Sequence, residues 1–314
     1  MNIVFFGTSG FAVPALEKLL ASRHKVLAVV TQPDRPAGRG QELHTSPVKE
    51  VAVAKAMYLF QPENCNEYEF LRELRALSPD VIVVVAYGQK LGNEILQMSR
   101  YYCLNIHPSL LPKYRGPEPV ARALLNGETH TGVCIVKVVE KMDAGPILGI
   151  TRVLVPPEVT TPELEDQLSV IGADLLMEVL DRVEPRQAVE IPQEEREATY
   201  AKKFEKNDGR IDWKKTAAKV HSFVRALIPY PCAFSSFNGK TRVIFWKVKP
   251  NRYAQRPAAD HGPGNIVAVD KDFFTVATAD GDVAVHEIQP ESKRRMSAAE
   301  FINGYQPKSG MFFS

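Results

Sequence analysis

The chain has 314 residues, of which 45% are hydrophobic and 24% are charged, and its formal net charge is +2. This composition is typical of a soluble globular protein, and the length is sufficient for two domains that each bury a core. No stretch approaches the ~18 consecutive apolar residues of a membrane-spanning helix, so no such helix is expected.

The N-terminus and the cysteines exclude further classes. Residues 1–7 lack a basic segment and are predicted to form a first strand rather than a signal peptide, so we expect a cytoplasmic protein. The cysteines are scattered, without a Cys-x-x-Cys pair, so neither a zinc site nor a disulfide framework is expected. They are Cys65, Cys103, Cys134 and Cys232.

Strand and helix patterns alternate through the first 183 residues. Apolar runs predict strands at residues 2–6, 25–31, 81–85, 133–138 and 147–154, and helical apolar spacing predicts helices at 11–20 and 162–183. The run 81–85 is apolar on both faces, as in a central parallel strand. Thr161 is the expected N-cap of the last helix, with Pro162 at its first position. This alternation predicts an open, mostly parallel α/β sheet.

The remainder of the chain has a different pattern. Residues 184–206 are predicted to be a linker, because they are rich in Glu, Pro and Gln and show little apolar periodicity. Helical spacing from Trp213 to Leu227 predicts a helix that ends before Pro229. Asn238-Gly239 and Asp280-Gly281 then lie between β-rich segments and are preferred hairpin corners. Residues 207–314 are therefore predicted to form a small all-β barrel or sandwich, with an oligonucleotide-binding (OB) barrel among the candidates.

Charge is distributed unevenly between these parts. Residues 1–206 contain 23 Lys and Arg against 27 Asp and Glu, whereas residues 207–314 contain 16 against 10. A basic C-terminal third favours a polyanionic partner, although a merely solvated lysine-rich surface would have the same composition.

The most informative motif is the run from Leu104 to Pro112. Alternate strand residues share a face, so Asn105 and His107 project from the same side of a predicted strand. Ligands bind outside the carboxyl ends of parallel strands, which is where this pair lies. An amide that polarises a carbonyl beside an imidazole that accepts a proton suits acyl-group transfer.

Other candidates are less specific from their residues alone. Asp143 lies in a predicted turn and is either a turn former or the third polar partner that the imidazole needs. The long loop from Thr31 to Lys49 carries Arg35 and Arg39, which could grip phosphates or be solvated. The turn after the first strand, residues 7–10, lacks the glycine spacing of a dinucleotide site.

Several segments along the chain carry a resemblance to a known family. They are Phe6 to Thr8, Thr31 to Gly40, Ser46 to Lys49, Val84 to Gly88, Asn105 to Pro112, Met142 to Gly145, Thr199 to Ala201, Arg210 to Trp213 and Met296 to Ala298. Together they resemble the methionyl-tRNA formyltransferase family over essentially the full chain.

The resemblance implies a Rossmann-like formyltransferase domain (1–183), a linker (184–206) and an OB-like tRNA-binding domain (207–314). It implies formyl transfer from the co-substrate 10-formyltetrahydrofolate to the amino group of methionyl initiator tRNA. Such a transfer requires no metal, and we expect a monomer. By position, the catalytic residues would be Asn105, His107 and Asp143, the tetrahydrofolate would be bordered by Ser109, Leu110, Leu111 and Pro112, and the tRNA would contact Arg35 and Arg39.

Two alternatives stay open. A formyltransferase acting on a small amine or an amino-sugar nucleotide would share the Asn-x-His run. It would leave two features without a purpose: the loop from Thr31 to Lys49 with Arg35 and Arg39, called the arginine loop below, and the basic C-terminal part. A non-catalytic RNA-binding protein would bind tRNA independently of folate and would leave Asn105, His107 and Asp143 unexplained.

Overall fold

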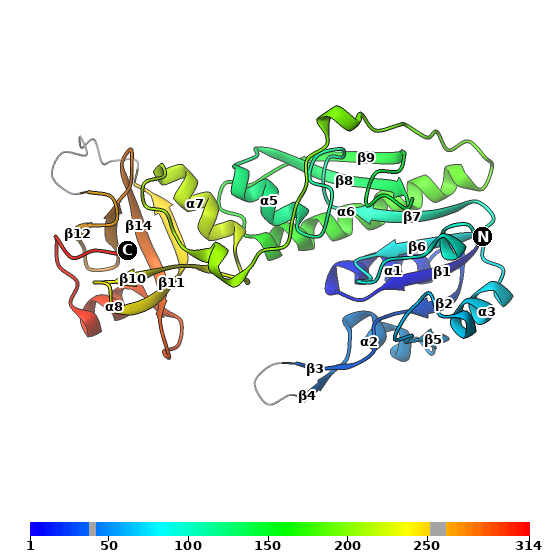
Figure 1. Ribbon diagram of the computed structural model, residues 1–314, viewed down its shortest axis with the longest axis horizontal. Helices are drawn as coiled ribbons and strands as arrows, with labels where there is room; N and C mark the ends of the chain where they lie inside the picture. The colour runs from blue at the N-terminus through cyan, green and yellow to red at the C-terminus, as the bar shows by residue number, and fades with distance from the viewer. Residues whose placement is uncertain (38–41, 252–261) are drawn as a thin grey trace. The chain divides into compact units, whose positions relative to one another are not determined.

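The computed structural model describes residues 1–37, 42–251 and 262–314, which form two compact units (Figure 1). The first unit contains residues 1–119, 130–154 and 165–201, and the second contains residues 120–129, 155–164 and 202–314. The second unit therefore includes two short segments from the middle of the chain as well as its C-terminal third.

A seven-stranded sheet forms the centre of the first unit. Its strands, in spatial order, are β5 (Leu59–Phe60), β2 (Lys25–Val30), β1 (Asn2–Gly7), β6 (Val81–Val85), β7 (Tyr102–His107), β8 (His130–Lys137) and β9 (Ile147–Leu154). The first five are parallel, and β8 and β9 run antiparallel to their neighbours. The predicted, mostly parallel α/β sheet is confirmed, and β6 is almost entirely buried at its centre.

Helices and a small hairpin complete this part of the chain. They are η1 (Gly10–Ala12), α1 (Val13–Leu20), β3 (Arg35–Ala37), β4 (Glu42–His44), α2 (Pro47–Ala54), α3 (Tyr68–Ala76), α4 (Asn93–Leu96), α6 (Thr161–Val183) after its first turn, and η2 (Glu195–Glu197). Helix α5 (Pro119–Asn126) belongs to the second unit except for its first residue. The expectation for Thr161 was wrong: α6 already includes it, and its hydroxyl donates to the carbonyl of Ala226 instead of capping the helix. Glu163 accepts from both the amide and the hydroxyl of Thr160, and these two bonds stabilise the start of the helix.

The two faces of the seven-stranded sheet are covered differently. Helix α6 packs closely on one face, where a side chain at Gly172 would meet Ile106 of β7 and Val133 of β8. Helix α3 and residues around α4 cover Phe6 and Ile82 on the other face. Because strand residues alternate, Asn105 and His107 lie on the face opposite Ile106 and away from α6.

The second unit contains an antiparallel sheet with strands in the order β10 (Ala233–Phe237), β11 (Thr241–Pro250), β14 (Asp282–Pro290), β13 (Phe274–Ala277) and β12 (Ile266–Val269), with β15 (Met296–Ser297) paired to β14. It also has η3 (Lys206–Gly209), α7 (Ala217–Ala226) and α8 (Ala298–Tyr305). The Asn238-Gly239 corner is confirmed: it joins β10 to β11, and its residues have φ values of 49° and 67°, as the tight hairpin turn requires. Near the C-terminus, Phe313 bridges to Phe237 and Phe312 to Asn265, which links opposite edges of the sheet into a barrel-like arrangement.

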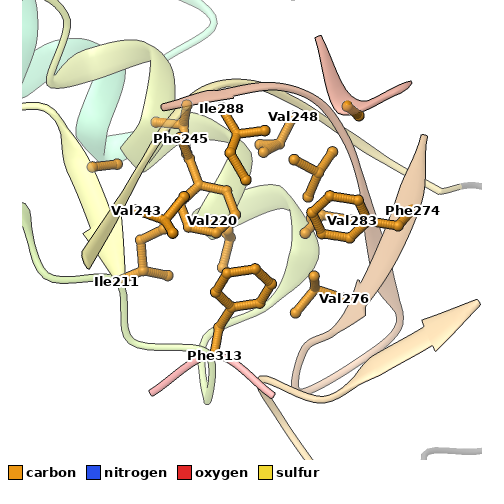
Figure 2. Packing of buried hydrophobic residues seen from close by; sticks show 14 of the residues in the cluster. Ile211, Val220, Val243, Phe245, Val248, Phe274, Val276, Val283, Ile288 and Phe313 are labelled. Carbon is orange, nitrogen blue, oxygen red and sulfur yellow. The ribbon is translucent and has the colours of Figure 1, made fainter. Parts of the chain in front are cut away.

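Aliphatic and aromatic side chains together fill the core of the second unit, and Figure 2 shows Phe245, Phe274 and Phe313 among valine and isoleucine side chains. Phe313 stacks on Phe274 with ring centroids 6.0 Å apart and meets Phe245 edge-on at 5.1 Å. Trp213 contacts Phe245 at 5.4 Å, but it lies outside the helix predicted for it, because Thr216 caps α7 and the helix begins at Ala217. The helical spacing predicted from the sequence includes Trp213, but this residue reaches the same apolar cluster from a turn before the helix.

Two further observations concern the whole described chain. In the described ranges, no helix combines the length and the hydropathy needed to cross a membrane. All four cysteines are buried thiols. Burial raises the pKa of each of them, to about 12 in the case of Cys134.

Candidate active site

The end of β7 presents Asn105 and His107 on one face of the sheet. Each is fixed in register, because Asn105 pairs with Val84 of β6 and Val136 of β8, and His107 pairs with Cys134 of β8. His107 is 4% exposed, whereas Asn105 is half-buried. The strand thus holds a buried imidazole beside an amide that is partly exposed.

Asp143 reaches this pair from the turn between β8 and β9. Its Oδ2 lies 3.7 Å from Nδ1 of His107, and its Oδ1 lies 3.5 Å from Nδ2 of Asn105. Oδ2 also accepts a 2.8 Å hydrogen bond from the backbone N–H of Gly116. The structure therefore brings together the three residues that the sequence analysis singled out, although they come from two segments of the chain.

The contacts of the imidazole constrain its protons. Nε2 of His107 lies 3.0 Å from the carbonyl oxygen of Tyr114, which can only accept a hydrogen bond. Nδ1 faces the carboxylate of Asp143, which is also an acceptor when ionised. When His107 is doubly protonated, each ring nitrogen donates toward its neighbour. When the imidazole is neutral and Nε2 carries the proton, a proton on Asp143 or on a bound amine is needed at Nδ1.

The loop after β7 folds back on the strand. Ser109 is fully buried, and its hydroxyl donates to the carbonyl of Lys113 at 2.7 Å. Leu111 packs with Cys134 and with Val136 of β8, and a side chain at Gly132 would collide with Leu110. Of the four residues expected to border a folate, Ser109 and Leu111 are thus buried, while Leu110 and Pro112 are half-buried.

A segment that the sequence analysis assigned to the linker supports this loop. Thr199 accepts at its hydroxyl from the amide of Tyr114 and at its carbonyl from the amide of Arg115, and Arg115 pairs in parallel with Tyr200. Gln193 also contacts the turn that carries Asp143. The polar composition of residues 184–206 gives no sign of these contacts, and within them only Thr199 to Ala201 resemble the family.

The arginine loop is described in part. Arg35 lies in β3, is exposed, and forms an ion pair with Glu63, whereas Arg39 lies outside the described residues. The loop is anchored at its start, since Lys49 and Gln61 donate to Asp34 and hold the pKa of that carboxyl below its usual value. Among the residues that the structure describes, no group of three or more His, Cys, Asp or Glu could hold a metal ion.

Comparison with known families covers both parts of the chain. The formyl transferase family model matches residues 1–180, and the model of the formyl transferase C-terminal domain matches residues 203–306. The methionyl-tRNA formyltransferase of Symbiobacterium thermophilum is 43% identical over 318 residues, which cover 100% of this chain and 95% of the relative.

Two solved structures with the same fold come from proteins with other names. WlaRD, a sugar 3N-formyltransferase solved with dTDP and 5-N-formyl-THF, aligns with a TM-score of 0.69 at 18% identity, covering 94% of this chain and 99% of that one. HypX from Aquifex aeolicus in complex with tetrahydrofolic acid aligns with a TM-score of 0.65 at 19% identity over 100% of this chain. The present chain spans half of that longer protein. At these identities the likeness concerns the fold.

Proposed function

The chain belongs to the methionyl-tRNA formyltransferase family, and we propose that it transfers the formyl group of 10-formyltetrahydrofolate to the α-amino group of methionine on initiator tRNA. The product would be N-formylmethionyl-tRNA for translation initiation. The observation that carries the proposal is the cluster of Asn105, His107 and Asp143 in a chain of this family. A folate donor agrees with the folates bound by the two solved proteins of the same fold.

In this proposal Asn105 stabilises the oxyanion. The neutral methionyl amine attacks the formyl carbon, and negative charge develops on the formyl oxygen. One N–H of Asn105 makes a long contact with Asp143, which leaves the second N–H for that oxygen. A single donor placed in this way contributes about 3–4 kcal/mol to transition-state stability.

His107 and Asp143 manage the protons. The attacking amine loses a proton, and N10 of the leaving tetrahydrofolate gains one, so the site must both accept and return a proton. The carboxylate of Asp143 faces Nδ1 of His107 at 3.7 Å and can stabilise an imidazolium near the oxyanion. Either residue can relay the proton, since both lie beside Asn105.

The second unit and the arginine loop would bind the tRNA. Residues 207–314 carry six more basic than acidic residues, and phosphate contacts are made mainly by Lys and Arg. Arg35, with Arg39 outside the described residues, would reach the acceptor end. Because such contacts release counterions, the affinity for tRNA should fall steeply as salt is added. We further propose that the enzyme acts as a monomer in the cytoplasm.

The catalytic assignment is tested with Asn105→Ala and Asp143→Asn. Each should lower kcat at least about 10²-fold while leaving the Kd for tRNA close to that of the wild type. The matched control is Asp174→Asn, an exposed carboxylate that forms an ion pair with Lys18. Near-normal turnover by either site variant would remove that residue from the mechanism.

The acceptor is tested by competition. The protein is incubated with 10-formyltetrahydrofolate and charged methionyl initiator tRNA, with free methionine and a nucleotide-linked amino sugar as competing acceptors. The amino sugar is included because WlaRD, which has the same fold, is a sugar formyltransferase. Formylation confined to the tRNA is expected, whereas preference for the amino sugar would establish the small-amine alternative.

A further inference from the structure

Gln193 makes two hydrogen bonds to the turn that carries Asp143. Its Nε2 donates to the backbone carbonyl of Asp143 at 2.8 Å and to that of Gly145 at 2.7 Å. Both bonds go to the main chain, so they fix the path of the turn and not merely one side chain. Gln193 is separated from Asp143 by 50 residues and comes from the segment that follows α6.

Arg115 fixes the orientation of the Gln193 amide. Nε and Nη2 of Arg115 donate to Oε1 of Gln193 at 3.1 and 3.0 Å. A guanidinium has donors only, so the amide oxygen must face it and the NH₂ group must face the turn. Arg115 is 1% exposed, and a buried charge of this kind persists only when its donors are paired.

Glu195 ties a second point of the same turn. It accepts from Nη1 of Arg115 at 2.9 Å and forms an ion pair with Lys141, two residues before Asp143. These two cations hold the pKa of Glu195 below its usual value. Arg115, Gln193 and Glu195 together form a brace, which contacts the turn at Lys141, Asp143 and Gly145.

The turn requires such support because its backbone is strained. Asp143 has φ = 52°, a left-handed conformation that a residue with a side chain adopts at a cost of roughly 1 kcal/mol or more. Gly145 lies so close to the carbonyl of Lys137 that a Cβ would stand 1.8 Å from that oxygen. Small movements of the turn would move the carboxylate of Asp143 away from His107 and from the N–H of Gly116.

We propose that Gln193, oriented by Arg115, is a positioning residue for the reaction: it holds the turn so that the carboxylate of Asp143 faces Nδ1 of His107. The inference rests on the proposed function, in which Asp143 handles a proton. Gln193 touches no reacting atom in this scheme and acts only through the turn. Within residues 191–201, Gln193 and Glu195 therefore support the turn that carries Asp143.

Two substitutions of Gln193 test the proposal. Gln193→Glu keeps the acceptor for Arg115 but removes both donors to the turn, and Gln193→Met removes the donors without adding a charge. Both should lower kcat about 10- to 100-fold, with little change in KM for either substrate. The matched control is Gln187→Glu, an exposed glutamine between the end of α6 and residue 191, which should behave as the wild type does.

A double-mutant cycle with Asp143→Asn separates positioning from a general structural role. If Gln193 acts through Asp143, then Gln193→Met should change the single-turnover rate constant less than about threefold in the Asp143→Asn background. A full additional loss there, or wild-type kcat in both Gln193 variants, overturns the proposal. Failure of the proposed function is seen separately, as normal turnover by Asp143→Asn alone. Thermal unfolding of every variant shows whether the fold is retained.

Discussion

The end of β7, where the proposed catalytic residues lie, and the core of the second unit are held in shape by different interactions. Around Asp143 and Arg115, polar groups are paired one with another, and Asp143, Tyr114 and Gly116 all have positive φ. The core around Phe245 and Phe313 is held by contact between apolar surfaces. A change in the first region should therefore cost turnover, whereas a change in the second should cost stability.

The largest expected effect tests the apolar side of this comparison. Phe245→Ala removes a fully buried ring that meets both Trp213 and Phe313 edge-on, and should lower the free energy of unfolding by about 3–5 kcal/mol. Both tryptophans, Trp213 and Trp246, belong to the second unit, so denaturant titration followed by tryptophan fluorescence reports on it directly. A loss below about 1 kcal/mol would mean that this core is not tightly packed.

The next effect tests the polar side. Gly145→Ala forces the turn away from the carbonyl of Lys137, and a displacement near 1 Å at Asp143 should lower kcat about 10²-fold, equivalent to about 2.7 kcal/mol. Steady-state formylation assays measure this loss. Gly304→Ala in α8 is the control, because nothing lies within 4 Å of the added methyl group and turnover should not change. Unchanged kcat in Gly145→Ala would show that the turn tolerates movement.

The second unit also contains a buried histidine, His221, whose protonation makes the stability of the fold depend on pH. Burial and the nearby Arg225 lower the pKa of His221 to about 4, with a further lowering by Lys249 and a partial offset by Glu158, 3.6 Å away. The unfolded chain, with a histidine pKa near 6.5, binds this proton more strongly than the folded chain does. Above about pH 6.5 His221 is neutral in both states, and the fold keeps its full stability. As the pH falls from 6.5 toward 4, the unfolded chain takes up this proton first, so the free energy of unfolding decreases.

His221→Leu should remove this dependence. Between pH 7.5 and 4.5 the wild type should lose roughly 2 kcal/mol more unfolding free energy than the variant. Denaturant titrations at the two pH values measure the difference. Equal losses in both proteins would assign acid destabilisation to other groups.

The smallest expected effect concerns a helix start. Ser297 caps α8 by accepting from the amide of Glu300 at 3.2 Å, while Glu300 accepts from the amide of Ser297 at 2.9 Å. Ser297→Ala should cost about 1 kcal/mol of stability and leave kcat unchanged. The same fluorescence titration detects it. A loss as large as that in Phe245→Ala would remove the distinction between capping bonds and the apolar core.

Much of the fold could be predicted from local pattern. Continuous apolar runs identified buried strands such as Val81–Val85, and Asn238-Gly239 marked a hairpin, because both depend on residues that are neighbours in sequence. Trp213 was wrongly assigned to a helix, since apolar spacing does not distinguish a helix from a turn whose side chain enters the same core. The β3–β4 hairpin, which pairs residues 35–37 with 42–44, was also missed, because Pro and Gly in residues 31–49 indicate a loop and give no strand-like apolar alternation.

The site was predictable only in part. Strand alternation predicts that Asn105 and His107 share a face. The local sequence predicts only a turn at Asp143, and the catalytic role expected for it comes from the resemblance. Gln193 and Arg115 could not be found, because their contacts join positions 78 residues apart and depend on how the chain returns after α6. A glutamine in a polar segment gives the same sequence pattern whether it is solvated or bonded to the turn that carries Asp143.

The burial of all four cysteines makes the chain suitable for site-specific labelling. Inaccessible thiols with raised pKa values form little reactive thiolate, so a thiol reagent should leave them unmodified in the folded chain. A single cysteine in place of Leu43, which is 72% exposed on the β3–β4 hairpin, would then be the one reactive position. A probe attached there could follow the arginine loop as tRNA is added, with every native cysteine kept.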